Sequence, residues 1–145
     1  MASLIVLAGS FVVLRLLGLE VGALDGWQPA LRGALAAMFL LTGIAHFGSR
    51  RAGFVEMVPP RLPRPALLVT VTGVLELAGA LGLLLAPTYR LAAGCLAVLL
   101  IFLFPANIHA ARSGARLAGR AVTPLPLRTA MQMLYVGCCL AVALS

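Results

Sequence analysis

The sequence ALLVTVTGVLELAGALGLLLA at residues 66–86 is followed, after PTYR, by LAAGCLAVLLIFLFPANIHAA at residues 91–111. Each stretch is long enough to cross the hydrocarbon core of a bilayer, because a helix needs about 20 mostly apolar residues to span about 30 Å. Glu76 is the only Asp, Glu, Lys or Arg in the two stretches. They predict two membrane-spanning helices joined by a tight turn, and this pair decides the fold class.

Three further apolar segments, at residues 2–24, 30–47 and 126–144, predict helices of the same kind. We therefore predict an all-α, polytopic membrane protein with a single membrane domain over residues 1–145. A soluble domain carries about 25% charged residues, whereas this chain has 10% and is 62% hydrophobic. This composition excludes a soluble enzyme, a disordered protein and a disulfide-stapled secreted scaffold. Segment 2–24 has no basic n-region and contains Arg15, so we predict a retained helix rather than a signal peptide.

The charge of the chain is basic, with a formal net charge of +7 and arginine at all 11 basic positions. The arginines lie between apolar runs, which favours contact with a lipid bilayer over nucleic-acid binding. Five spans would place eight arginines on one side and two on the other; the eight are Arg50, Arg51, Arg61, Arg64, Arg112, Arg116, Arg120 and Arg128, and the two are Arg32 and Arg90. The positive-inside rule then predicts a cytoplasmic N-terminus and an external C-terminus.

The loop at residues 54–65, FVEMVPPRLPRP, contains four prolines. Proline fixes φ and removes a donor, so we expect this loop to be stiff and extended rather than helical. Its apolar residues Phe54, Met57 and Leu62 predict that it packs on the bundle with these side chains buried. Two interpretations stay open, a cap that rests on the lipid headgroups and a lid over an opening between helices.

Two charged residues are predicted near the middle of the membrane. At 1.5 Å per residue, Glu76 lies about 15 Å into its span and Arg15 about 17–20 Å into the first. An unpaired charge is costly at this depth. We therefore predict an intramembrane ion pair between Arg15 and Glu76, with the first helix packed against the Glu76 helix.

Polar residues at helical spacing form a second layer nearer the cytoplasm. Together with Glu76 they give the candidate ligand-binding residues, which are His46, Thr72, Glu76, Asn107 and Gln132. Pro105 adds a free acceptor, because proline leaves the carbonyl four residues earlier, that of Ile101, without its partner. The alternative is that these groups only hold the helices together. For Thr42, Thr70 and Thr72 this structural role is the preferred interpretation.

Other chemical motifs are weak. Two histidines without regular spacing argue against a zinc or haem centre, so we predict no metal site. Cys95, Cys138 and Cys139 lie in apolar runs, where cysteine is typically a small buried hydrophobe, and the sequence assigns them no role. Small residues let membrane helices approach closely; the glycines expected to do so are Gly43, Gly73, Gly79 and Gly82.

The chain contains a succession of short motifs, which are GIAHF at 43–47, Phe54, MVPP at 57–60, LPRP at 62–65, Thr72-Gly73 with Glu76, YRLA at 89–92 and FPANI at 104–108. This succession resembles the DoxX-like family of small bacterial membrane proteins. The resemblance covers about residues 35–144. It implies a four-helix transmembrane bundle made of the last four spans, so the segment at 2–24 is one extra N-terminal transmembrane helix. It also implies a bacterial inner-membrane location, but it carries over no agreed catalytic residues.

The resemblance implies a function linked to redox chemistry, and it leaves two classes open. In the first, the protein is a redox-associated small subunit that binds a quinone or lipid-like ligand in its bundle, with redox-enzyme partner subunits. Glu76 and His46 would then bond to the ligand head or exchange protons with it. In the second, it is a non-catalytic membrane scaffold or assembly factor. A transporter is less favoured, because charges are few and no inverted repeat is evident. A homo-oligomer is compatible with either class.

Overall fold

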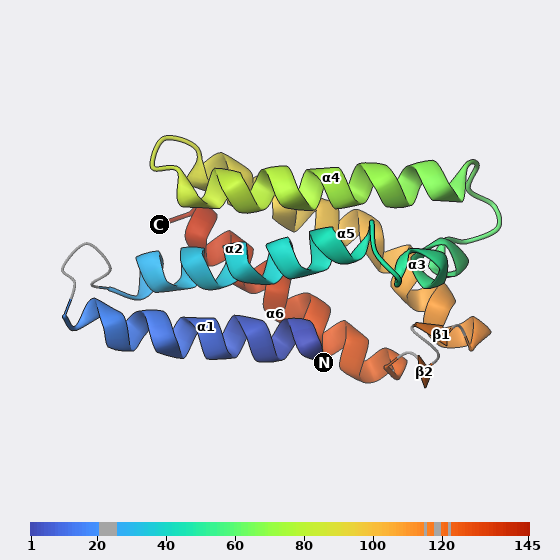
Figure 1. Cartoon of the computed structure of the whole chain (residues 1–145), viewed down its shortest axis with the longest axis horizontal. Helices are drawn as coiled ribbons and strands as arrows, with labels where there is room; N and C mark the ends of the chain where they lie inside the picture. The colour runs from blue at the N-terminus through green and yellow to red at the C-terminus, as the bar shows by residue number, and fades with distance from the viewer. Residues whose placement is uncertain (21–25, 115, 118–119, 122) are drawn as a thin grey trace.

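The structure is a computed structural model that describes residues 1–20, 26–114, 116, 117, 120, 121 and 123–145. The described residues form six helices and one short antiparallel hairpin (Figure 1), which confirms the all-α class. The elements are α1 (Ala2–Gly18), α2 (Trp27–Ala45), α3 (Arg51–Met57), α4 (Pro65–Leu84), α5 (Tyr89–Ser113), β1 (Arg116–Leu117), β2 (Arg120–Ala121) and α6 (Leu125–Ala143). Within this part of the chain, α2, α4, α5 and α6 are long and apolar enough to cross a membrane.

Proline and glycine set several helix boundaries. Pro65 opens α4 and Pro126 lies in the first turn of α6, where the missing N–H of proline has no intrahelical partner to lose. Gly114 follows α5 with φ of 68°, a left-handed conformation that glycine adopts without steric cost. The predicted spans therefore begin and end close to their expected positions in α4, α5 and α6.

The first helix is shorter than predicted. It ends at Gly18 rather than Leu24, because the N–H groups of Leu19 and Glu20 bond to the carbonyls three residues earlier and close a tight turn. Residues 21–25, which include the rest of the predicted span, lie outside the described residues. At 1.5 Å per residue the helix is about 25 Å long, so the extra N-terminal helix is present but short.

The long helices pack in the order α1, α2, α4, α5 and α6, each against the next (Figure 1). The expected packing of the first helix against the Glu76 helix is wrong, since α1 packs along α2 and α2 separates it from α4. A hydrogen bond of 3.0 Å between the Ser3 and Tyr135 hydroxyls also links α1 to α6. Figure 1 shows that the N-terminus lies part-way along α6 rather than at its end.

Helices α4 and α5 are close together at one end and diverge toward the other (Figure 1). Where they are close, Gly79 faces Leu96 and Gly82 faces Ala92, and a Cβ added at either glycine would lie within 2.8 Å of the facing side chain. Where they diverge, α3 contacts both helices and fills the space between them. The glycines therefore allow α4 and α5 to approach closely at one end, and α3 covers the space between the two helices at the other end.

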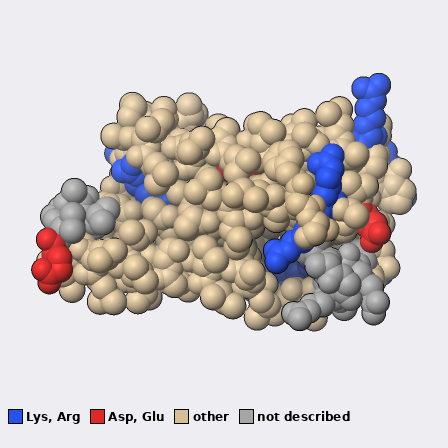
Figure 2. Space-filling view, in the orientation of Figure 1, with Lys and Arg blue, Asp and Glu red and all other residues tan. Residues whose placement is uncertain are grey.

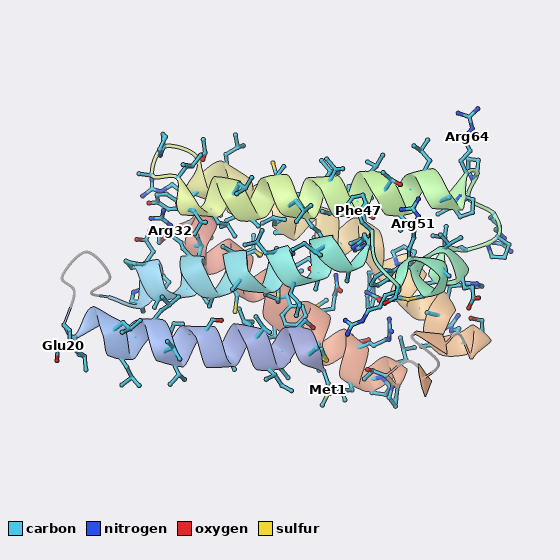
Figure 3. All side chains as sticks on the ribbon, viewed as in Figure 1. Met1, Glu20, Arg32, Phe47, Arg51 and Arg64 are labelled. Carbon is cyan, nitrogen blue, oxygen red and sulfur yellow. The ribbon has the colours of Figure 1, made fainter. Side chains whose placement is uncertain are left out.

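Charged side chains gather at the two ends of the bundle. Figure 2 shows a middle band almost without Lys, Arg, Asp or Glu on the visible face, as expected for a surface that faces lipid. In Figure 3, Arg51 and Arg64 lie at the α3 end, and Glu20 and Arg32 lie at the opposite end. At that opposite end the Arg32 guanidinium lies 4.1 Å from the centre of the Tyr89 ring.

Candidate functional site

A cavity of about 790 Å³ lies in the half of the bundle that α3 covers. Its lining is mostly apolar and comes from every helix. All five predicted ligand-binding residues line it, namely His46, Thr72, Glu76, Asn107 and Gln132. The structure therefore brings the predicted polar residues together around one space. This volume lies within the usual 300–1,000 Å³ of ligand pockets.

Glu76 is the buried acid of this cavity. Its side chain is 6% exposed, and its Oε2 atom lies 3.9 Å from Nδ1 of His46, which is within ion-pair distance. Among the described residues, no hydrogen-bond partner reaches Oε2. A buried carboxyl oxygen without a hydrogen bond is costly. The carboxyl group is therefore available to a molecule in the cavity.

His46 has a fixed orientation. Its Nδ1 lies 2.8 Å from the Thr42 carbonyl oxygen, and because a carbonyl only accepts, this ring nitrogen carries the hydrogen. The ring stacks on Phe54 of α3, with centroids 4.4 Å apart and an interplanar angle of 6°. The Arg51 guanidinium donates to the His46 carbonyl and to Thr70 Oγ1, at 3.2 and 2.8 Å. Helix α3 therefore holds the histidine in place as well as covering it.

A second polar group links α5 and α6 by a chain of hydrogen bonds. The Arg128 guanidinium donates to Asn107 Oδ1 at 2.6 Å, and Asn107 Nδ2 donates to Gln132 Oε1 at 3.3 Å. Gln132 Nε2 then donates to the carbonyl oxygen of Leu100. The sequence predicted a free carbonyl at Ile101, four residues before Pro105. The Gln132 amide instead donates to the carbonyl of the preceding residue, Leu100. Because these bonds use the amide acceptors, Asn107 and Gln132 mainly fix the helices, in line with the structural alternative.

The threonines bond to their own helices. Thr72 Oγ1 donates to the Val69 carbonyl at 3.1 Å, and Thr42 Oγ1 donates to the Phe39 carbonyl at 3.4 Å. Both residues line the cavity, and the Thr42 hydroxyl also lies within hydrogen-bonding reach of the Glu76 carboxyl. Glu76 and His46 are therefore the groups best placed to recognise a polar head in this cavity.

The family model described as domain of unknown function, DUF8561, matches residues 35–143. This chain belongs to the DUF8561 family. The match runs from Leu35 within α2 to the end of α6, so it contains the cavity residues of α2 to α6 and excludes α1. Comparison with curated proteins and with solved structures gave no match.

The predicted ion pair between Arg15 and Glu76 is wrong for this DUF8561 chain. Leu14 packs against Gly33, and the neighbouring Arg32 donates to the Leu83 carbonyl at 3.0 Å, so Arg15 lies near the level of Leu83. Glu76 is seven residues, or about 10 Å, farther along α4. The depth estimate failed because α1 begins beside the cavity, which Met1, Ala2 and Ser3 line, and not at the end of the bundle.

The proline-containing loop also differs in part from its prediction. Arg51–Met57 is helical, because the four prolines begin only at Pro59. Met57 is buried and Phe54 is half-buried, as expected for a segment that packs on the bundle, but Leu62 is 46% exposed. The stacking of Phe54 on His46 had no signal in the sequence, since it depends on how α3 folds back over α2.

The remaining reactive residues lie apart from the site. Cys139 is fully buried in the core, Cys138 is half-buried, and Cys95 is exposed, contrary to the expectation for Cys95. Within the described ranges, no three His, Cys, Asp or Glu side chains are grouped as metal ligands. Within the described part of the chain, the cavity therefore combines the Glu76 carboxyl and the His46 imidazole with an apolar wall. Its other polar lining residues include Arg50, Arg61, Arg128 and the hydrogen-bonded Ser3 and Tyr135 hydroxyls.

Proposed function

We propose that this DUF8561 protein is a small redox-associated membrane subunit that binds a quinone or similar lipid-like molecule inside its bundle. The observation that carries the proposal is the largely apolar cavity, in which the buried Glu76 Oε2 has no hydrogen-bond partner among the described residues. An apolar wall with a few polar groups is typical of sites for small molecules. The redox assignment rests on the DoxX-like motifs, and with it the proposed partners, subunits of a redox enzyme.

The wall of the cavity supports a bulky apolar ligand. Phe39, Leu99, Leu103 and Met131 come from three helices and provide contact surface without polar atoms. A ligand with an apolar body and one small polar head would bury its body against these side chains. Its head would reach Glu76 and His46. A non-catalytic scaffold would not need such a space, and this favours ligand binding over the scaffold alternative.

The ligand content of the purified protein tests this proposal. We expect Ala106→Phe, which places a large side chain in the cavity wall, to lower the amount of copurified quinone or other lipid-like molecule at least about fivefold. Such a loss corresponds to about 1 kcal/mol of binding free energy. The measurement is organic extraction followed by mass spectrometry, normalised to protein. The matched control is Ala141→Phe on the exposed face of α6, which should retain the wild-type amount. Equal amounts in all three proteins would contradict the proposal.

We further propose that the protein lies in the bacterial inner membrane with the α3 end in the cytoplasm. Arg50, Arg51 and Arg64 belong to this end, whereas Arg32 and Arg90 belong to the other. Cytoplasmic loops carry an excess of arginine because basic residues are retained on that side. This orientation places the N-terminus toward the cytoplasm and the C-terminus outside.

Reporter fusions test the orientation. Fusions after residues 62, 118 and 145 should be read as cytoplasmic, cytoplasmic and external. The physical reason is the arginine asymmetry between the loops. A cytoplasmic signal from the fusion after residue 145 would contradict the proposed orientation.

A further inference from the structure

We propose that Glu76 and His46 select a neutral ligand that carries a hydroxyl group over the matched ligand that carries a carbonyl. The inference rests on the proposed ligand site and names the chemical class that the site takes. It follows from counting the hydrogen-bond donors and acceptors that the two residues leave free.

His46 offers a ligand only a hydrogen-bond acceptor. Its Nδ1–H is used by the Thr42 carbonyl at 2.8 Å. Within the described part of the chain its other ring nitrogen, Nε2, has no hydrogen-bond partner, and the ring lines the cavity. In the neutral imidazole, the nitrogen without a hydrogen can only accept. A ligand hydroxyl can donate to it, and a ligand carbonyl cannot.

Glu76 offers a ligand at least one hydrogen-bond acceptor, whether its carboxyl group is ionised or protonated. The ionised carboxylate offers two acceptor oxygens, and the protonated group keeps one acceptor and gains one donor. A ligand carbonyl can therefore bond only to the protonated form. A ligand hydroxyl can bond to both forms, because it donates and accepts. The same preference follows in each state.

The charges around the cavity favour a neutral head. Arg50, Arg61 and Arg128 line the cavity, and among the described residues Glu76 is the only acidic one in the lining. A cationic head would be repelled by the arginines. An anionic head would be attracted by the arginines, but beside Glu76 it would be repelled by the ionised carboxylate. A neutral hydroxyl on an apolar body avoids both penalties, so it fits the deep end of the cavity.

An aromatic diol and the dione formed by its oxidation provide a matched pair of probes. We expect tetramethylhydroquinone to bind the wild-type protein about tenfold more tightly than tetramethylbenzoquinone, which is the effect of about one additional hydrogen bond. The measurement is anaerobic titration calorimetry of the full chain in lipid nanodiscs, with each probe prepared separately. A tenfold preference would raise the midpoint potential of the bound couple by about 30 mV, because the couple transfers two electrons.

The variant Glu76→Gln tests the residue assignment. Its amide permanently provides N–H donors, so the dione should gain affinity because it no longer requires a protonated carboxyl, and the diol should stay the tighter ligand because His46 still accepts only from a hydroxyl. Glu56→Gln, an identical change on the exposed side of α3, should keep the wild-type ratio. Equal or tighter binding of the dione by the wild-type protein would overturn the inference and leave the proposed function standing. An unchanged affinity for the dione in Glu76→Gln would overturn the role of Glu76. If neither probe bound, both the inference and the proposed quinone ligand would fail.

Discussion

Asn107→Leu is expected to lower the free energy of unfolding by about 3 kcal/mol. The asparagine lies between Arg128 and Gln132 in the hydrogen-bond chain. Leucine would leave Arg128 Nη1 and Gln132 Oε1 without these bonds, whereas Arg128 Nε keeps the Thr123 carbonyl and Gln132 Nε2 keeps the Leu100 carbonyl. Unsatisfied buried polar groups cost about 1–3 kcal/mol each, more when charged. The measurement is unfolding by SDS in mixed micelles, followed by circular dichroism.

Thr129→Val provides the matched control for this change. The Thr129 hydroxyl donates only to the Leu125 carbonyl of its own helix, at 3.0 Å, so its removal should cost less than about 1 kcal/mol. If Asn107→Leu is no more costly than Thr129→Val, the chain of bonds between α5 and α6 does not stabilise the bundle.

Gly73→Leu is expected to cost about 3 kcal/mol or more and to displace His46. A Cβ at Gly73 would lie 2.7 Å from the His46 Cβ and 2.9 Å from the Phe47 ring. Helices α2 and α4 would have to separate, and over-packing of a tight contact costs about 1–3 kcal/mol, occasionally more. The same unfolding titration measures the loss.

Gly94→Leu is the control for Gly73→Leu. A Cβ at Gly94 has no neighbouring atom within 4 Å among the described residues. Leucine also has a higher helix propensity than glycine, so the stability should be unchanged or slightly higher. Equal destabilisation by the two substitutions would show that close packing at Gly73 is not the cause.

The sequence was sufficient to predict the long helices and the face of each helix on which its polar residues lie. Thr72 and Glu76 are four residues apart on one helix, as are Thr42 and His46 on another, and this spacing places each pair on one face. Hydropathy found the four long helices, because a chain in lipid must satisfy its backbone within each helix. These two regularities predicted that the polar residues would meet in the bundle.

The position of one helix along its neighbour could not be predicted in the same way. The pairing of Arg15 with Glu76 assumed that both spans begin at the same membrane edge. The pattern of apolar residues fixes which face of a helix is buried, but it does not fix the axial offset between two helices. The close contact of Leu14 with Gly33 sets this offset, and it depends on side-chain packing that a one-dimensional pattern does not contain.

The structure was also needed to determine which candidate residues hold the helices together and which can bind a ligand. The sequence placed Asn107, Gln132 and Glu76 in one group of polar residues. In three dimensions the two amides satisfy each other and neighbouring groups, whereas Glu76 Oε2 has no hydrogen bond within the described residues. Donor and acceptor geometry separates residues that hold the helices from residues that can bind a ligand.

Native mass spectrometry of the intact wild-type protein, released directly from its own membranes, tests the central claim most directly. The cavity is predicted to hold a neutral amphipathic molecule, so the spectrum should show the protein with one such adduct. Collisional release should give the mass of a quinone, a quinol or a related lipid. A protein that carries no such adduct, and is found only as a stoichiometric complex with another protein, would contradict ligand binding and support the scaffold alternative.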